Sequence, residues 1–489
     1  MKASTLSTSV ISTPPVPADT PDPGRWASLA VVLTGAFLAA LDFFIVNVSI
    51  PAIRTSLNAT FAEVQLIIAS YGLTYAVLLI SGGRLGDIYG RRKMFVWGVI
   101  SFTAASLLCG IAPSPFLLIA ARALQGVSGA LLFPQVLSII QVTFPIRERA
   151  TAFGFFGTVI GLSSFAGNAL GGVLVSADLW HLGWRPIFLI NLPIGLLTVI
   201  FAEKFVKESS SPKARRLDLG GVAILTVALS LLLYPLIQGR ESGWPPWAFG
   251  CLIAFIPAMI IFVRYEKQVT ARGGSPLVEL SLFHNRVFVI GLCSGVCFFS
   301  GAAAFFLIST IFLQNGLGYS ARHAGLTFLW FAIAFLGSSL ASVRVQPKLG
   351  SRIINLGVMF MISGLASLLW LSWFRGAALT SLNLAPVLLI YGTGQGFVMP
   401  TLINTILMNI KGQDAGSASG VLTTVQQASF ATGVAVIGTV FFSALGRLSS
   451  TEAFVRALRI AFSVNICLLL VTFVLILQIP RFPAREQTR

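Results

Sequence analysis

The sequence predicts an all-helical membrane protein with many spans, and two observations carry this prediction. Hydrophobic residues make up 56% of the 489 residues and charged residues only 10%, a balance that is not expected of a water-soluble protein of this size. The apolar residues also fall in long runs, each close to the roughly 20 residues that a helix needs to cross the hydrocarbon layer. Lipid is therefore expected to surround most of the chain.

The apolar runs predict where the chain crosses the membrane. About fourteen runs fit, each bounded by charged residues, glycine or proline. The expected spans lie near residues 27–49, 62–82, 95–112, 115–140, 151–175, 187–205, 218–238, 247–264, 287–313, 323–343, 353–374, 383–408, 416–443 and 459–479.

The positive charge of the chain points to a membrane rather than to nucleic acid. The net charge is +17, but most of the Lys and Arg residues form short clusters between spans, on the side that holds the N-terminus. This asymmetry follows the positive-inside rule and predicts two cytoplasmic termini in a plasma (inner) membrane. The loop with Arg447, Arg456 and Arg459 runs against the rule. No basic and aromatic motif for nucleic acid is present.

The chain is expected to fold as two bundles with an insertion between them. Residues 1–24 are rich in Ser, Thr and Pro and predict a disordered cytoplasmic tail without a cleavable signal peptide. The expected parts are an N-terminal six-helix bundle at 25–206, a linker with two extra spans at 207–270, a C-terminal six-helix bundle at 271–480 and a cytoplasmic tail at 481–489.

Neither a metal nor an organic cofactor is expected. The five cysteines lie within apolar runs and form no CxxC pair, so they predict packing rather than disulfides or metal ligation. No GxxxxGK[ST] loop is present, which excludes ATP as the direct energy source. An ion gradient remains as the source of energy.

The two halves share faint internal repeats. At one constant offset, the loop after the second span matches the loop after the tenth: Arg84, Gly90 and Arg92 correspond to Arg344, Gly350 and Arg352. At a nearby offset, Gln125-Gly126 on the fourth span corresponds to Gln395-Gly396 on the twelfth. Duplicated bundles of this kind are common in transport proteins.

Four segments together resemble the major facilitator superfamily, in particular its fourteen-span drug:proton antiporter branch of the EmrB/QacA type. They run from Leu41 to Pro51, from Gly83 to Arg92, from Arg122 to Gly126 and from Trp184 to Pro193. The resemblance covers nearly the whole chain. It implies the major facilitator fold, with two six-helix bundles and two extra central transmembrane helices, and transport by alternating access.

The loop after the second span is expected to act as a conformational latch. Its glycines permit a sharp turn and close helix approach, and the resemblance implies that its carboxylate holds the outward-facing state through charge-assisted hydrogen bonds. The latch residues are Gly83, Arg84, Asp87, Gly90, Arg91 and Arg92. The alternative is a cytoplasmic positive loop without this role.

Asp42 and Arg122 are the candidates for proton coupling. Both lie inside apolar spans, where an ionised side chain costs about 2.5 kcal/mol or more. A buried carboxyl beside an arginine can bind and release a proton as its surroundings change, which is the chemistry that an antiporter needs. The alternative is a static ion pair between helices.

Further residues are expected at helix contacts or in a substrate cavity. Span five carries Gly167, Asn168, Gly171 and Gly172, where Asn168 replaces the proline of the antiporter signature; the small residues permit tight packing but a kink is not assured. The cavity candidates are Gln125, Gln426, Trp330 and Tyr391.

The predicted function is proton-coupled efflux of small amphiphilic molecules, such as drugs, antibiotics or secondary metabolites. The second bundle lacks additional acids inside its spans, which disfavours dicationic substrates. The short loop near residues 443–458 predicts a transporter without an exterior adaptor, and a monomer is expected.

A nutrient facilitator or proton symporter is the alternative function. A membrane-embedded enzyme is more remote, because His181, His284 and His323 lie near loops and form no catalytic group.

Overall fold

The computed structural model describes residues 22–211, 217–239, 243–446 and 450–479, which contain helices and no strand. The helices are α1 (Arg25–Leu57), α2 (Phe61–Tyr89), α3 (Arg91–Ile111), α4 (Pro115–Thr143), α5 (Ile146–Ala177), α6 (Pro186–Leu189), α7 (Asn191–Phe205), α8 (Leu219–Gln238), α9 (Pro246–Ala271), α10 (Arg286–Ile311), α11 (Ala321–Thr327), α12 (Leu329–Leu349), α13 (Arg352–Arg375), α14 (Ser381–Leu407), α15 (Ala415–Leu445) and α16 (Thr451–Leu477). Short turns of helix lie at Leu179–His181, Leu280–His284, Phe312–Gly316, Gly376–Ala378 and Gly412–Asp414.

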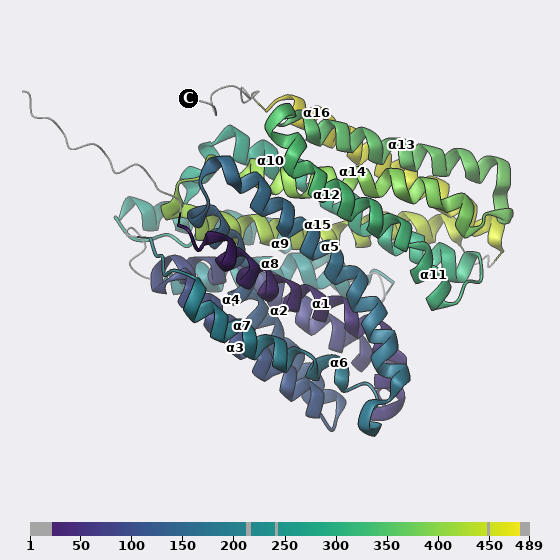
Figure 1. Ribbon diagram of the computed structural model, residues 1–489, viewed down its shortest axis with the longest axis horizontal. Coiled ribbons are helices and arrows are strands. Elements are labelled where there is room, and N and C mark those ends of the chain that lie inside the picture. Colours follow the sequence, from purple (N-terminus) through teal and green to yellow (C-terminus); the bar gives the residue numbers. More distant parts are fainter. Residues whose placement is uncertain (1–21, 212–216, 240–242, 447–449, 480–489) are drawn as a thin grey trace, which may run out of the picture.

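Each expected span corresponds to a helix or to a pair of consecutive helices. Within the described residues, 13 helical segments are long and apolar enough to cross a membrane. The remaining long helix, α5, has 32 residues and returns the chain from the end of α4 to the opposite end of the molecule (Figure 1). The predicted all-helical membrane fold is confirmed.

The helix ends differ from the hydropathy estimates in ways that matter for function. The sixth span is interrupted, since the one-turn α6 is followed by α7 from Asn191 onward. The eighth span was expected to end near residue 264, but α9 continues to Ala271 and carries the buried side chain of Glu266 into the helix. A span that is estimated from hydropathy ends at such charged residues, because hydropathy cannot show that folding will bury them and give them bonding partners.

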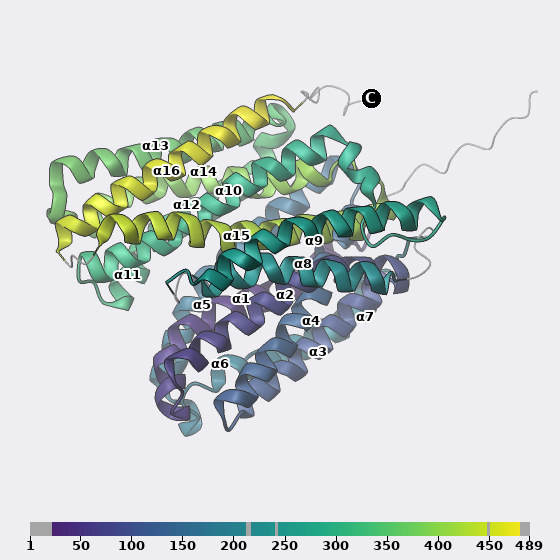
Figure 2. The same ribbon diagram turned by 180° about the vertical axis from the view of Figure 1, so that it is seen from behind.

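Two bundles make up the body of the molecule. Helices α1–α7 form the first bundle, purple to blue in Figure 1, and α10–α16 form the second, green to yellow. We call the end where α1 begins and α16 ends the terminal end, and the opposite end the far end. The bundles meet through α2 and α15 and through α5, α12 and α14, and their helices diverge toward the far end (Figures 1 and 2).

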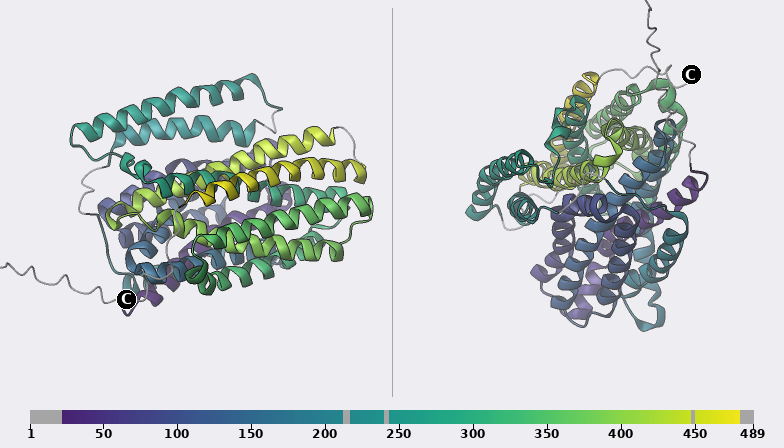
Figure 3. Two further views of the ribbon diagram at one scale, coloured as in Figure 1. Left: turned by 90° about the horizontal axis from the view of Figure 1, so that it is seen from above. Right: turned by 90° about the vertical axis from the view of Figure 1, so that its left-hand side faces the viewer.

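Helices α8 and α9 form a hairpin at the side of the two bundles. The hairpin is seen as a separate pair of teal helices in Figure 3 and lies in front in Figure 2. Its helix α8 packs against α2 of the first bundle and α15 of the second. The extra spans therefore border the junction between the bundles.

The sequence repeat is matched by repeated packing. Gly90 and Gly350 each end a helix with a positive φ, at 104° and 57°, a backbone conformation that glycine adopts without strain. A Cβ at Gly126 would lie 2.4 Å from the carbonyl oxygen of Tyr71, and one at Gly396 would lie 2.5 Å from that of Phe335. In each bundle, two helices are therefore in close contact at equivalent glycines.

Candidate functional site

Asp42 and Arg122 meet inside the first bundle. Arg122 Nη1 on α4 lies 2.5 Å from Asp42 Oδ2 on α1. The Asp42 side chain is 0% exposed and that of Arg122 is 2% exposed. The expected contact is therefore present, and its role in proton coupling stays a prediction.

Amide side chains complete the surroundings of Asp42. Asp42 Oδ1 accepts hydrogen bonds from Gln125 Nε2 at 2.8 Å and from Asn191 Nδ2 at 2.9 Å. Gln125 Oε1 in turn accepts from Arg122 Nη1 at 2.6 Å, and Ser106 Oγ accepts from Gln125 at 2.8 Å. Side chains of α4 and α7 thereby meet the Asp42 carboxyl group of α1, and Ser106 on α3 binds Gln125 and Asn191 behind it. We call Asp42, Ser106, Arg122, Gln125 and Asn191 the Asp42 network.

Sequence reasoning found part of this network. Gln125 was expected to contact substrate, but the structure places it against Asp42 and Ser106, fully buried. Asn191 lies in the Trp184 to Pro193 segment that carried the family resemblance, so its motif was a usable signal. Ser106 lies in an apolar run without any motif, and only the fold brings it to Gln125 and Asn191.

An aromatic ring and a tight helix contact lie next to the Asp42 network. The Arg122 guanidinium lies 4.3 Å from the ring centroid of Tyr71, a distance suited to a cation–π interaction. A Cβ at Gly167 on α5 would lie 2.7 Å from Phe44 Cβ on α1, so this glycine lets α5 approach the helix that carries Asp42. Gly171 is buried and Gly172 half-buried, whereas the side chain of Asn168 lies outside the described residues.

The latch carboxylate joins the two bundles. Asp87 on α2 accepts hydrogen bonds from the backbone N–H groups of Gly416 at 3.1 Å and Ser417 at 3.0 Å. These are in the first turn of α15, whose dipole favours a negative charge there. Arg91 Nη2 donates to Asp87 Oδ1 at 2.7 Å and to the carbonyl oxygen of Gly412 at 2.7 Å.

Only one of the three arginines expected around Asp87 forms an ion pair with it. That residue is Arg91, while Arg92 lies 3.8 Å from Glu208 and Arg84 lies 3.9 Å from Glu279. The α15 helix start replaces them as the second partner, which the sequence could not show because the donors are backbone groups.

Close backbone packing surrounds the latch. A Cβ at Gly83 would lie 2.2 Å from the carbonyl oxygen of Gly416, so α2 and α15 touch where Asp87 bonds. Nearby, Gln141 Nε2 on α4 donates to the carbonyl oxygens of Leu407 at 2.9 Å and Ile410 at 3.1 Å. The two bundles are thus joined at the terminal end.

Two of the expected cavity residues, Trp330 and Tyr391, lie on α12 and α14 of the second bundle. Trp330 is 41% exposed and shares an apolar stripe of α12 with Ile333 and Leu340, on the side of the helix away from Ser339, which bonds to α5. Contact of Trp330 with substrate stays a prediction. Tyr391 is buried within the second bundle and stacks on Phe305 at 3.9 Å, which makes it a packing residue in this conformation.

Gln426 is buried on α15, which packs against α2, and its contact with substrate stays a prediction.

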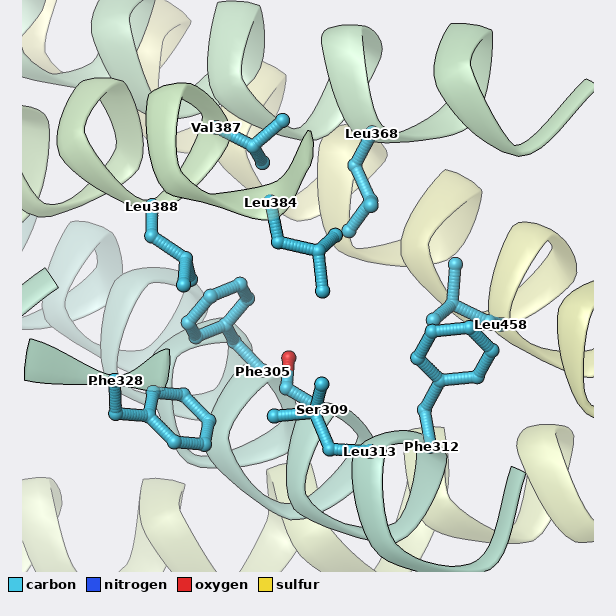
Figure 4. Close-up of a pocket in the computed structure, with 10 residues that line it drawn as sticks. All are labelled: Phe305, Ser309, Phe312, Leu313, Phe328, Leu368, Leu384, Val387, Leu388 and Leu458. Atoms are coloured by element: carbon cyan, nitrogen blue, oxygen red, sulfur yellow. The ribbon is translucent and has the colours of Figure 1, made fainter. Parts of the chain in front are cut away.

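A small cavity of about 20 Å³ lies within the second bundle (Figure 4). Its lining is apolar except for Ser309 and includes Phe305, Phe312 and Leu384. A void of this size has room for about one water molecule, so it is a packing defect rather than a substrate site.

Comparison with known proteins agrees with the architecture. The sequence pattern of the Major Facilitator Superfamily matches residues 32–434. This chain belongs to that superfamily. Its fold and family are those of transporters that bind small molecules, so the predicted family is confirmed.

Relatives in this superfamily include exporters of antibiotics. The chain is 42% identical to a "probable actinorhodin transporter" of Streptomyces coelicolor, over 86% of this chain and 73% of that protein. It is 34% identical to a "cephamycin export protein" of Amycolatopsis lactamdurans, over 84% of each chain. The structure of the human organic anion transporter MFSD10 matches with a TM-score of 0.65 and 16% identity, over 93% of this chain and all of that one.

Proposed function

We propose that this protein exports small amphiphilic molecules across the plasma membrane in exchange for protons. The observation that carries the proposal is the Asp42 network, a buried carboxyl bonded to Arg122, Gln125 and Asn191. A carboxyl in such surroundings binds a proton when its partners move away and releases it when they return. Relatives that are named as antibiotic transporters and exporters support the direction and the class of substrate.

The terminal end is proposed to face the cytoplasm, since the basic clusters lie there. In that orientation the bonds of Asp87 and Gln141 close the cytoplasmic side, and the structure represents an outward-facing conformation. Rocking of the bundles would break these bonds and expose the region between them to the cytoplasm. The proton gradient supplies the energy without a cofactor, and the protein is proposed to work as a monomer without an adaptor.

Proteoliposomes with an acidic lumen test this proposal. Protons that leave the lumen drive substrate inward in an antiporter and outward in a symporter. We expect accumulation of amphiphilic dyes or antibiotics in the lumen, and loss of accumulation when an ionophore collapses the proton gradient. Outward movement with the protons would show a symporter, and transport that ignores the gradient would show a facilitator.

A further inference from the structure

A pair of acids, the buried Glu266 and the half-buried Asp218, lies where the α8–α9 hairpin reaches the terminal end. Glu266 on α9 is 0% exposed, and its Oε2 accepts a hydrogen bond from the backbone N–H of Val278 at 3.2 Å. Asp218 caps α8, since its Oδ1 accepts from the backbone N–H of Gly221 at 2.9 Å. The hydroxyl of Tyr265 also donates to Asp218 Oδ1, at 2.9 Å.

Within the part of the chain that the structure describes, the other oxygen of each carboxyl group is buried without a hydrogen-bond donor. Among the described residues, Glu266 Oε1 and Asp218 Oδ2 have no hydrogen-bond partner. Both face Gly221: a Cβ built there would lie 2.5 Å from Glu266 Oε1 and 2.8 Å from Asp218 Oδ2. Two carboxylates whose buried oxygens approach one point repel each other, whereas one proton shared between them removes a charge and gives each oxygen a partner.

Charged residues next to this pair connect it with the latch. Arg84 on α2 is buried, lies 3.9 Å from Glu279 Oε1, and interacts electrostatically with both Glu266 and Asp87. A change of charge on Glu266 therefore alters the field at the guanidinium that also acts on the latch carboxylate.

We propose that Asp218 and Glu266 form a second proton-binding site, separate from Asp42, which gives transport a dependence on pH at the terminal side. In the loaded state Glu266 Oε1–H donates to Asp218 Oδ2. On unloading, the proton passes to water at the terminal end and leaves one more negative charge beside Arg84. The proton site itself is independent of substrate, while its effect on transport rests on the proposed proton-driven export.

Infrared spectroscopy of the full-length protein in lipid nanodiscs tests the site without substrate or gradient. We expect the carbonyl band of a protonated carboxylic acid at neutral pH, retained in Asp42→Asn and lost in Glu266→Gln. Asp218→Asn keeps a good helix cap but removes the repulsion, so it should lose or shift the band as well. Glu203→Gln, which changes an exposed acid at the same end, should match the wild type. A carbonyl band that is unchanged in Glu266→Gln would overturn the proposal of a proton-binding site.

Transport assays test the effect of the site separately. Gln at position 266 imitates the protonated acid, so Glu266→Gln should still accumulate substrate but respond less to pH on the terminal side. Asp42→Asn should instead lose gradient-driven accumulation. A Glu266→Gln profile that coincides with the wild-type profile would refute the regulatory effect, whatever the fate of the export proposal.

Discussion

At the scale of single residues, Asp42 on α1 is held by side chains from two other helices, α4 and α7. Three donors, from Arg122, Gln125 and Asn191, point at its two oxygens, and hydrogen bonds to a carboxylate stabilise the charged form. Removal of one partner from a buried ion pair costs about 3–5 kcal/mol. The contact between Asp42 and Arg122 is therefore strong enough for a change of conformation to alter proton binding at Asp42.

Asn191→Ala should move the pH dependence of transport. Loss of its hydrogen bond removes about 1.5 kcal/mol of stabilisation from the group that is proposed to carry the proton. The pH of half-maximal transport should therefore differ from that of the wild type. The measurement is initial transport rate against pH in proteoliposomes.

A matched control for Asn191→Ala is available in the second bundle. Asn465 is also buried and donates to the carbonyl oxygen of Gly301 at 2.9 Å, far along the chain from the Asp42 network. Asn465→Ala should leave the midpoint unchanged. The same midpoint in both variants and the wild type would argue against a role of Asn191 at Asp42.

At the scale of helices, the junction between α2 and α15 decides which conformation is populated. Asp87 links the end of α2 to the start of α15, and the glycines at positions 83 and 416 permit the contact. The sequence showed the glycines and the carboxylate through their spacing. It could not show the backbone donors of α15, since these lie more than 300 residues away in the chain.

Asp87→Asn should open the terminal end. The substitution keeps the shape of the side chain but replaces charge-assisted hydrogen bonds with neutral ones, a loss of about 1.5 kcal/mol, or about tenfold in the ratio of closed to open molecules. Spin labels at the exposed positions Tyr89 and Lys411, in a cysteine-free background, report the distance between these helix ends.

Asp414→Asn is the control for the latch, because Asp414 lies beside the start of α15 and its carboxylate accepts a hydrogen bond from the neighbouring Gln413 at 3.5 Å. Its distance distribution should match that of the unmodified chain. Equal distributions for Asp87→Asn and the wild type would show that Asp87 does not hold the bundles together.

At the scale of the whole molecule, hydropathy and motif spacing predicted the bundle architecture, while contacts between distant helices escaped them. Long apolar runs give helices because lipid leaves the backbone no other partners. Glu266 was missed because the charges around residue 264 suggested the end of a span, although α9 buries this acid against Val278 and Gly221.

The charge distribution predicts which substrates are carried. From Arg286 to Leu477 the chain contains only two acids, Asp414 and Glu452, at a turn and in the first turn of α16. A dication would find no buried acid there to offset its desolvation. Gradient-driven accumulation should therefore be at least tenfold greater for neutral or weakly charged amphiphiles than for dicationic dyes of similar size. Equal accumulation of both classes would contradict this preference.

The most direct test of proton-driven export compares gradient-driven accumulation with substrate exchange in Asp42→Asn proteoliposomes. Glu63→Gln is the control, since glutamine preserves the capping box of α2 that Glu63 forms with Thr60. We expect that Asp42→Asn still exchanges labelled for unlabelled substrate across the membrane but no longer accumulates it against a gradient, while Glu63→Gln does both. Accumulation by Asp42→Asn at the wild-type level would contradict the central role of this carboxyl group.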